Sequence, residues 1–190
     1  SYLTINYRTT EEIRKYAFGL LKGIPFDDLD DEYDEGKTCQ SLTHGDVPRI
    51  EVFNSAAEEI DFLIAQIKQL IESGVEPKNI CIVARTHRLL DDYIAQLTRA
   101  GIRTYEIKRS KLDDRSFDGV RLATMHRVKG LEFLHVFVVA ANNRILPLAS
   151  AIPHTDPVAE TEAMTAERCL LYVSLTRAQK SAYITSYGSP

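Results

Sequence analysis

Short apolar runs of strand length alternate with segments of helical periodicity along most of this 190-residue chain. Several of the runs are apolar almost throughout, which is expected for strands that are buried on both faces of a sheet. The predicted strands are Arg49–Phe53, Asn79–Ala84, Ile102–Ile107, Gly119–Met125, His135–Ala141 and Ser181–Tyr187.

Four segments have apolar residues at the spacing of an amphipathic helix. The predicted helices run from a Thr10 cap to about Gly23, from a Ser55 cap to Gly74, from Leu89 to Arg99 and from about Thr165 to Arg177. Strands that alternate with helices favour right-handed crossovers. The sequence therefore predicts one α/β domain, with a mainly parallel sheet covered by helices on both faces. The polar stretch Asn142–Glu162 is interpreted as a surface connection.

Composition describes an ordinary globular chain, with 44% hydrophobic and 26% charged residues. No apolar run has the length needed to cross a bilayer and nothing resembles a signal peptide, so no membrane partner is expected. Cys39, Cys81 and Cys169 form no C-x-x-C pair and are widely spaced, which favours reduced thiols in a cytosolic protein over a disulfide framework or a metal site. The net charge of −4 does not exclude nucleic acid, because many acids are concentrated in one segment.

That acidic segment, residues 26–37, ends in Gly36-Lys37 and is followed by Thr38, the ending of many phosphate-binding loops. The loop of P-loop proteins reads G-x-x-x-x-G-K-[ST], and Asp31 stands where its first glycine is needed. No strand pattern precedes Gly36, and neighbouring carboxylates would repel a phosphate. The segment is interpreted as a solvated acidic loop.

Ligands of parallel sheets gather beyond the carboxyl ends of strands, so the polar residues just after strands are the candidates for function. In LTINYRTT, Tyr7 and Arg8 read on their own as a buried aromatic beside a salt-bridging arginine. TMHRVKGLEF, residues 124–133, carries too many ionisable groups to bury without cost, which favours a functional loop. In ERCLLYVSLTRAQ, Arg177 alone is typical of a charge that complements a helix dipole.

Taken together and in this order, the three stretches resemble motifs IV, V and VI of the superfamily 1 DNA helicases of the UvrD/Rep/PcrA type. NYRTT resembles the family's N-Y-R-S-T, TMHRVKGLEF its T-x-H-x-x-K-G-L-E-F, and LLYVSLTRAQ its L-x-Y-V-x-x-T-R-A. The whole chain, residues 1–190, resembles the C-terminal RecA-like domain of these helicases, called 2A, a three-layer fold of the P-loop NTPase type.

The resemblance implies half of an ATP site. In this family ATP, with Mg²⁺, lies between two RecA-like domains, and the N-terminal one carries the Walker A and B elements, which have no match in this sequence. By resemblance, Tyr7 stacks on the adenine and Arg8 contacts the γ-phosphate. Glu132, near Gly130, accepts a hydrogen bond from the ribose, and Arg177 is the arginine finger. Arg8 and Arg177 are therefore the expected catalytic residues, and the metal is expected to be held by the other domain and the phosphates.

The resemblance also implies contacts to single-stranded DNA. Arg85, Thr86 and His87 after one strand, with Thr124 and His126 of motif V, match the family's DNA-contacting positions. Such side chains can hold phosphates without reading the base sequence, as a translocating motor requires. The expected partners are single-stranded DNA and the N-terminal RecA-like domain of the same parent chain. The implied location is the cytoplasm, with the nucleoid.

Two features depart from the family pattern. Long members insert an accessory domain, called 2B, before motif V, whereas here only KRSKLDDRSFDG separates Ile107 from Val120. Motif V also has Arg127 and Val128 where small residues are usual. Lys129 could serve DNA or its own loop, whereas the remaining histidines are interpreted as ordinary surface or strand residues: His44, His135 and His154.

The expected function is the C-terminal motor domain of an ATP-dependent DNA helicase, which is inactive by itself. One alternative is a non-catalytic DNA- or protein-binding module on the same fold. A small-molecule enzyme on a dinucleotide-type fold is a weaker alternative, because the sequence has no G-x-G-x-x-G after its first strand.

Overall fold

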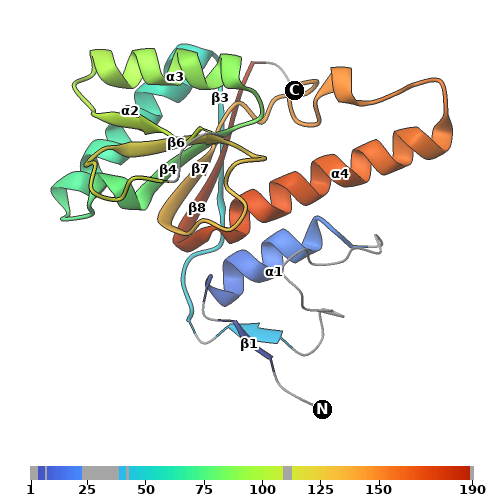
Figure 1. The fold of residues 1–190 in the computed structure, drawn as a ribbon, viewed down its shortest axis with the longest axis horizontal. Coiled ribbons are helices and arrows are strands. Elements are labelled where there is room, and N and C mark those ends of the chain that lie inside the picture. The colour runs from blue at the N-terminus through green and yellow to red at the C-terminus, as the bar shows by residue number, and fades with distance from the viewer. Residues whose placement is uncertain (1–3, 7, 23–38, 42, 109–112, 189–190) are drawn as a thin grey trace.

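The computed structural model describes residues 4–6, 8–22, 39–41, 43–108 and 113–188 (Figure 1). Its main sheet has the strand order β3-β8-β7-β4-β6-β5, and every neighbouring pair is parallel. The strands are β3 (Arg49–Phe53), β4 (Ile80–Ala84), β5 (Thr104–Glu106), β6 (Val120–Thr124), β7 (Phe133–Val138) and β8 (Ala178–Tyr187). The predicted mainly parallel sheet is confirmed.

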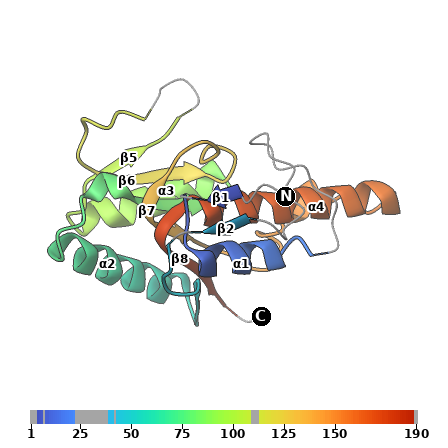
Figure 2. The ribbon, with the colours of Figure 1, turned by 90° about the horizontal axis from the view of Figure 1, so that it is seen from below.

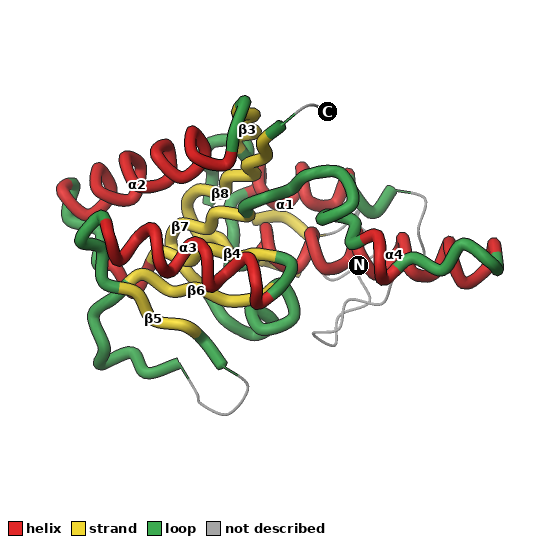
Figure 3. The backbone as a smooth tube through the Cα atoms, turned by 90° about the horizontal axis from the view of Figure 1, so that it is seen from above, coloured by secondary structure: helices red, strands yellow, loops and turns green. Residues whose placement is uncertain are grey.

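Helices cover both faces of this sheet, so the predicted three-layer α/β architecture is also confirmed (Figure 3). On one face lie α2 (Ala56–Glu72) and α3 (His87–Arg99), which pack Leu63, Ile67, Leu90 and Leu97 against the strands. On the other face lie α1 (Glu11–Gly19) and α4 (Pro157–Thr176). Two short 3₁₀ turns complete the described elements, η1 (Pro77–Asn79) and η2 (Ala149–Ala151).

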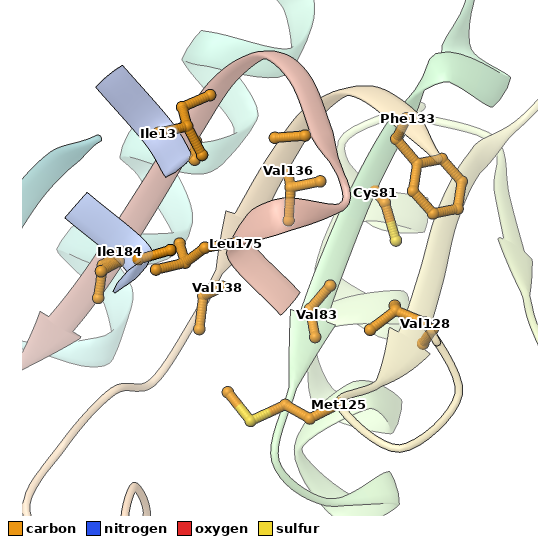
Figure 4. Close-up of a cluster of buried hydrophobic side chains, with 14 of the residues drawn as sticks. Ile13, Cys81, Val83, Met125, Val128, Phe133, Val136, Val138, Leu175 and Ile184 are labelled. Atoms are coloured by element: carbon orange, nitrogen blue, oxygen red, sulfur yellow. The ribbon is translucent and has the colours of Figure 1, made fainter. Parts of the chain in front are cut away.

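The core beneath α1 and α4 joins segments from both ends of the chain. Figure 4 shows Ile13 of α1 and Leu175 of α4 beside Val136, Val138 and Ile184 of the two neighbouring strands. All five side chains are buried, and removing them from water stabilises the docking of both helices by about 1.5–3 kcal/mol for each large side chain. The N-terminal segment is thereby held against the C-terminal half of the domain.

A second, small sheet was not predicted from the sequence. It pairs β1 (Thr4–Asn6) with β2 (Cys39–Ser41) in parallel and lies beside α1 (Figure 2). The Glu11 carboxylate accepts a hydrogen bond from the Ser41 backbone N–H at 2.8 Å and pairs with Arg14, which together bring the pKa of Glu11 down to about 2. Three-residue strands are too short to show an alternating pattern, so the sequence carries no clear signal for them.

Several element boundaries differ from the predicted ones. α4 begins at Pro157 rather than near Thr165, because the Asp156 side chain accepts from the Val158 N–H and Pro157 occupies the first turn. The C-terminal part of the stretch interpreted as a surface connection is therefore helical. Similarly, α3 begins at His87 rather than Leu89, and β7 begins at Phe133 rather than His135.

The connection between β5 and β6 is short, and no inserted domain is present between Ile107 and Val120. The acidic segment 26–37 lies outside the described residues. Within the part of the chain that the structure describes, no helix is long and apolar enough to span a bilayer, and no group of three His, Cys, Asp or Glu side chains is arranged to hold a metal ion.

Candidate functional site

The three motif-bearing stretches meet at the amino ends of β7 and β8. Thr9, next to Arg8, donates from Oγ1 to the carbonyl oxygen of Ala178 at 2.5 Å. The Phe133 N–H, next to Glu132, donates to the carbonyl oxygen of Arg177 at 3.0 Å. Since Phe133 and Ala178 are paired in the sheet, residues 169 positions apart in the chain lie side by side.

Arg8 and Glu132 form an ion pair at this edge of the sheet. Arg8 Nε lies 3.1 Å from Glu132 Oε1, with the two side chains 53% and 37% exposed. The second carboxylate oxygen of Glu132 accepts from Gln179 Nε2, also at 3.1 Å. Glu132 is therefore held between a charged and a neutral donor, and its remaining lone pairs can still accept a hydrogen bond from a ligand hydroxyl.

Gly130 sits in the tight turn that precedes Glu132. Its φ is +79°, a conformation that side chains other than glycine rarely adopt, and the Leu131 N–H closes the turn on the carbonyl oxygen of Val128 at 3.0 Å. A Cβ at Gly130 would meet no heavy atom within 4 Å. The turn conformation, rather than local crowding, explains why glycine stands here.

Arg177 is the C-cap residue of α4 and is only 6% exposed. Its Nε donates to the carbonyl oxygen of Val173 at 3.1 Å, and its Nη2 donates to Thr176 Oγ1 at 3.3 Å. The guanidinium thus contacts the last turn of its own helix, where its positive charge also complements the helix dipole. The backbone of Arg177 is at the same edge as Arg8 and Glu132, whereas its charge points into the domain. Tyr7, the predicted adenine contact, lies outside the described residues.

This location differs from the expectation that functional residues follow the carboxyl ends of strands. Glu132 and Arg177 come immediately before β7 and β8, at the amino ends of these strands. The residues with a predicted DNA role do follow strands, because Arg85 comes directly after β4, and Thr124 ends β6. The predicted ATP contacts therefore lie at the amino ends of the strands, here called the amino edge of the sheet. The predicted DNA contacts lie at the carboxyl ends, here called the carboxyl edge.

At the carboxyl edge, Arg85 forms a bidentate ion pair with Glu167 of α4. Its Nη2 and Nε lie 2.6 Å and 3.0 Å from the two carboxylate oxygens, and both side chains are largely buried. Burial alone would raise the pKa of Glu167, but the Arg85 guanidinium and the Leu148 N–H, which donates at 3.0 Å, give a net lowering. Arg85 is thus engaged inside the domain rather than presented on its surface.

Thr86 and His87 begin α3. Thr86 is the N-cap, and its Oγ1 accepts from the Leu89 N–H at 3.4 Å. The His87 ring is exposed, with Nδ1 3.5 Å from a carboxylate oxygen of Glu106. Of these two predicted DNA contacts, only His87 has a side chain that is turned to solvent.

Thr124 ends β6, and His126 lies within the turn that follows it. Thr124 is almost fully buried, and its carbonyl oxygen accepts from the Arg127 N–H at 2.8 Å. His126 is exposed, yet partial desolvation and the nearby Arg85 charge lower its pKa from the usual 6.5. Both effects favour the neutral form of the imidazole.

Two polar residues that hold candidate residues in place were missed by the sequence analysis, Glu167 beside Arg85 and Gln179 beside Glu132. Glu167 lies in the middle of a helix, and its side chain is only 5% exposed in the structure, so it needs a buried partner. The sequence does not show which arginine is that partner. Gln179 is an ordinary polar residue by sequence, and only the pairing of β7 with β8 places it beside Glu132.

A family model described as the UvrD-like helicase C-terminal domain matches residues 1–116 and 97–189 of this chain. This chain belongs to that family. The predicted resemblance to the C-terminal domain of UvrD- and PcrA-type helicases is confirmed.

Two relatives of this UvrD-like domain are named as DNA helicases. YjcD of Bacillus subtilis strain 168, a DNA helicase by name, is 32% identical over 116 residues, which cover 60% of this chain and 14% of YjcD. The ATP-dependent DNA helicase PcrA of Staphylococcus epidermidis is 41% identical over 69 residues, which cover 36% of this chain and 9% of PcrA. The chain thus spans only a small part of these relatives.

A solved structure supports the fold of this UvrD-like domain. The C-terminal domain of a possible DNA helicase from Lactobacillus plantarum WCFS1 superposes with a TM-score of 0.65 at 20% identity. The alignment covers 97% of this chain and 89% of that one. The shared architecture therefore extends over nearly the whole domain.

Proposed function

We propose that this chain is the C-terminal motor domain of an ATP-dependent DNA helicase or translocase. In this proposal it supplies half of an ATP cleft and part of a track for single-stranded DNA, and the N-terminal RecA-like domain of the same parent chain supplies the Walker elements. The observation that carries the proposal is the meeting of Arg8, Glu132 and the Arg177 backbone at the amino ends of β7 and β8.

The exposed edge formed by Arg8, Gly130, Glu132 and Gln179 is suited to half of a nucleotide site. The Arg8 guanidinium is always charged and can bind a phosphate oxygen, and the Glu132 carboxylate can accept from a ribose hydroxyl. ATP with Mg²⁺ would supply the phosphoanhydride bond whose hydrolysis drives the motor. Tyr7 would contribute the adenine contact.

Arg177 is proposed to act as the arginine finger. A guanidinium stabilises the negative charge that develops on a transferring phosphoryl group, and its loss lowers the rate by about 10³–10⁵-fold in enzymes that use one. To reach a phosphate, Arg177 must give up its hydrogen bond to the Val173 carbonyl oxygen. Finger insertion would therefore accompany closure of the cleft, which is the step that links hydrolysis to movement along DNA.

The carboxyl edge of the sheet is proposed to face single-stranded DNA. His87 and His126 have exposed rings there, whose N–H groups can donate hydrogen bonds to phosphate oxygens. Thr86 and Thr124 shape the same edge through the cap and the turn that they form. Arg85 could contact a phosphate directly only by releasing Glu167.

The test is hydrolysis of ATP, with and without single-stranded DNA, by the full-length protein that carries this domain. Arg177→Ala is expected to lower turnover about a thousandfold or more while ATP binding persists, and Arg177→Lys is expected to recover little of it. Arg8→Ala should weaken ATP binding and turnover. Arg168→Ala, an exposed arginine on the same helix, is the matched control and should hydrolyse ATP normally.

A non-catalytic DNA- or protein-binding module is the second candidate, because the inward hydrogen bonds of Arg177 also suit a purely structural arginine. That candidate predicts normal hydrolysis in Arg177→Ala, together with a lower melting temperature. The proposed motor predicts that Arg177→Ala loses hydrolysis while ATP binding persists, whatever its melting temperature, and it also predicts that the isolated 190-residue chain hydrolyses no ATP.

A further inference from the structure

Among the described residues, the ion pair of Arg85 with Glu167 is more deeply buried than those of Arg8 with Glu132 and of His87 with Glu106. Three N–O distances of 2.6, 3.0 and 3.1 Å join the Arg85 guanidinium to the Glu167 carboxylate. The side chain of Arg85 is 11% exposed and that of Glu167 is 5% exposed. Removing one partner of such a pair leaves a buried charge without compensation, which costs several kcal/mol. The pair is therefore held firmly while both partners are present.

This pair connects three segments at the carboxyl edge of the sheet. Arg85 directly follows β4, and Glu167 lies within α4. Glu167 also accepts from the Leu148 N–H, in the connection between β7 and α4. The Arg85 charge is close enough to influence the His126 imidazole, so the pair borders the surface proposed to bind DNA.

The same helix connects this edge to the opposite one. Figure 1 shows α4 as one continuous helix that ends against β8, and its C-cap is Arg177. Ten residues separate Glu167 from Arg177, which is about 15 Å along a helix axis. A shift of Glu167 along or about the axis is therefore carried to Arg177, because a hydrogen-bonded helix of this length moves nearly as a rigid body.

We propose that the Arg85–Glu167 pair couples the DNA-facing edge to the placement of Arg177, with Arg85 acting as a positioning residue and not as a phosphate ligand. The inference rests on the proposed motor function. In this proposal, DNA that binds against His126 and the start of α3 displaces the end of β4. Arg85 moves with the end of β4, and its ion pair with Glu167 transmits the movement to α4. The helix then shifts at its C-terminal end, where Arg177 lies. Hydrolysis then responds to DNA without any DNA contact near the nucleotide.

The test uses Glu167→Gln in the full-length protein, because Glu167 touches neither proposed ligand. Glutamine keeps the size of the side chain and removes the charge. The expected result is unstimulated ATP hydrolysis within about twofold of wild type, while stimulation by oligo(dT) falls about tenfold, inside the usual range of coupling between sites. Oligo(dT) affinity, from fluorescence anisotropy, should stay within about threefold.

Glu162→Gln is the matched control, since Glu162 is exposed on the same helix and loses the same charge. It should be stimulated like wild type. Arg85→Lys keeps the charge but loses the bidentate fork, and it should also lose stimulation. Because this variant preserves a buried charge pair, it keeps the test decisive if Glu167→Gln does not fold.

Three results would overturn the inference. Unchanged stimulation in a folded Glu167→Gln protein would show that the pair carries no coupling. Tighter oligo(dT) binding with unchanged stimulation would show that the released Arg85 is itself a DNA ligand. An equal fall of stimulated and unstimulated rates, with a lower melting temperature, would show a purely structural pair. Failure of the motor proposal looks different, because then wild-type hydrolysis itself would not respond to oligo(dT).

Discussion

At the residue scale, the buried charged groups that matter most for the fold have hydrogen-bonding partners, either on their own helix, as for Arg177, or on other segments, as for Arg121. Arg121 of β6 is 0% exposed, and its guanidinium donates to an Asp113 oxygen at 2.8 Å and to the carbonyl oxygens of Asp114, Phe117 and Gly119. It also lies over the Tyr105 ring. Arg121 thus holds the short connection between β5 and β6 in place through several hydrogen bonds. This connection lies where longer relatives of this type are expected to insert a domain.

Replacing Arg121 by Met is expected to lower the free energy of unfolding by about 3–5 kcal/mol, because the Asp113 carboxylate and three carbonyl oxygens lose their donor. Urea denaturation of the 190-residue chain would measure the change. Arg115→Ala is the control, since Arg115 pairs with the same Asp113 and donates to the Lys78 carbonyl oxygen and Asn79 but is about half exposed, and it should cost about 1–2 kcal/mol. Similar costs for both variants would contradict the assigned role of Arg121.

His135 predicts a pH dependence of stability. Its burial, with a smaller contribution from Lys180, lowers its pKa below the usual 6.5, and its Nδ1 lies 2.6 Å from Ser181 Oγ. The unfolded chain then binds the proton more readily, so stability is lost as the pH falls below 6.5. Unfolding measured between pH 7 and pH 5 should show a loss of up to about 1.4 kcal/mol per pH unit for this group.

His135→Gln should flatten this part of the profile. His126 has a lowered pKa as well and adds a loss in the same direction. The carboxylates with lowered pKa values, such as Glu11, cause a loss of stability only below their usual pKa of 4.5. The pH dependence that comes from the histidines can therefore be measured apart from the one that comes from the carboxylates. A profile that is equally steep in wild type and His135→Gln would assign the whole effect elsewhere.

At the scale of elements, the starts of the helices are set by local hydrogen bonds. Thr10, Ser55, Thr86 and Asp156 each accept from a backbone N–H of the first turn that follows. The caps of α1 and α2 are predictable from the sequence because these bonds span only a few residues. Thr86 is a cap of the same kind, although family resemblance alone assigns it to DNA.

Thr86→Ala is expected to cost about 1 kcal/mol of stability, whereas Thr86→Ser should keep most of the cap. Thermal unfolding would measure both, with Ser55→Ala on α2 as the matched cap control. If single-stranded DNA affinity falls in Thr86→Ala but is restored in Thr86→Ser, either the hydroxyl or the helix start matters for DNA. If stability is unchanged in Thr86→Ala, the capping role is wrong.

At the scale of the whole molecule, the two proposed ligand surfaces occupy opposite ends of the parallel strands. Arg8 and Glu132 lie where β7 and β8 begin, and His126 lies just beyond the end of β6. In the full-length protein, Arg8→Ala should raise the ATP concentration needed for half-maximal hydrolysis about tenfold, since a hydrogen bond to a charged group is lost. Its affinity for single-stranded DNA without nucleotide should stay within about twofold.

His126→Ala should affect the other ligand: we expect weaker binding of single-stranded DNA and normal ATP binding, the reverse of Arg8→Ala. Anisotropy of a labelled oligonucleotide and the ATP dependence of hydrolysis would measure the two quantities. Equal weakening of DNA binding by Arg8→Ala and His126→Ala would contradict the assignment of the two edges.

Features that depend on neighbouring residues were predictable from the sequence. The strands buried on both faces, the helix faces, the caps at Thr10 and Ser55 and the three motif stretches depend on periodicity and on bonds that span a few positions. The family membership also follows from these local patterns, because each motif is a continuous stretch. The boundaries of α4 and β7 were less predictable, because tertiary packing extends or shifts elements at their ends.

Only the tertiary structure decided which candidate residues meet. The edge at which Glu132 and Arg177 lie, the engagement of Arg85 by Glu167 and the place of Gln179 all follow from strand order and register. Arg85 and Glu167 are 82 positions apart, and Thr9 and Ala178 are 169 apart. Such contacts form because the parallel sheet brings distant segments together and because a buried charge must be paired, and neither condition leaves a local pattern in the sequence.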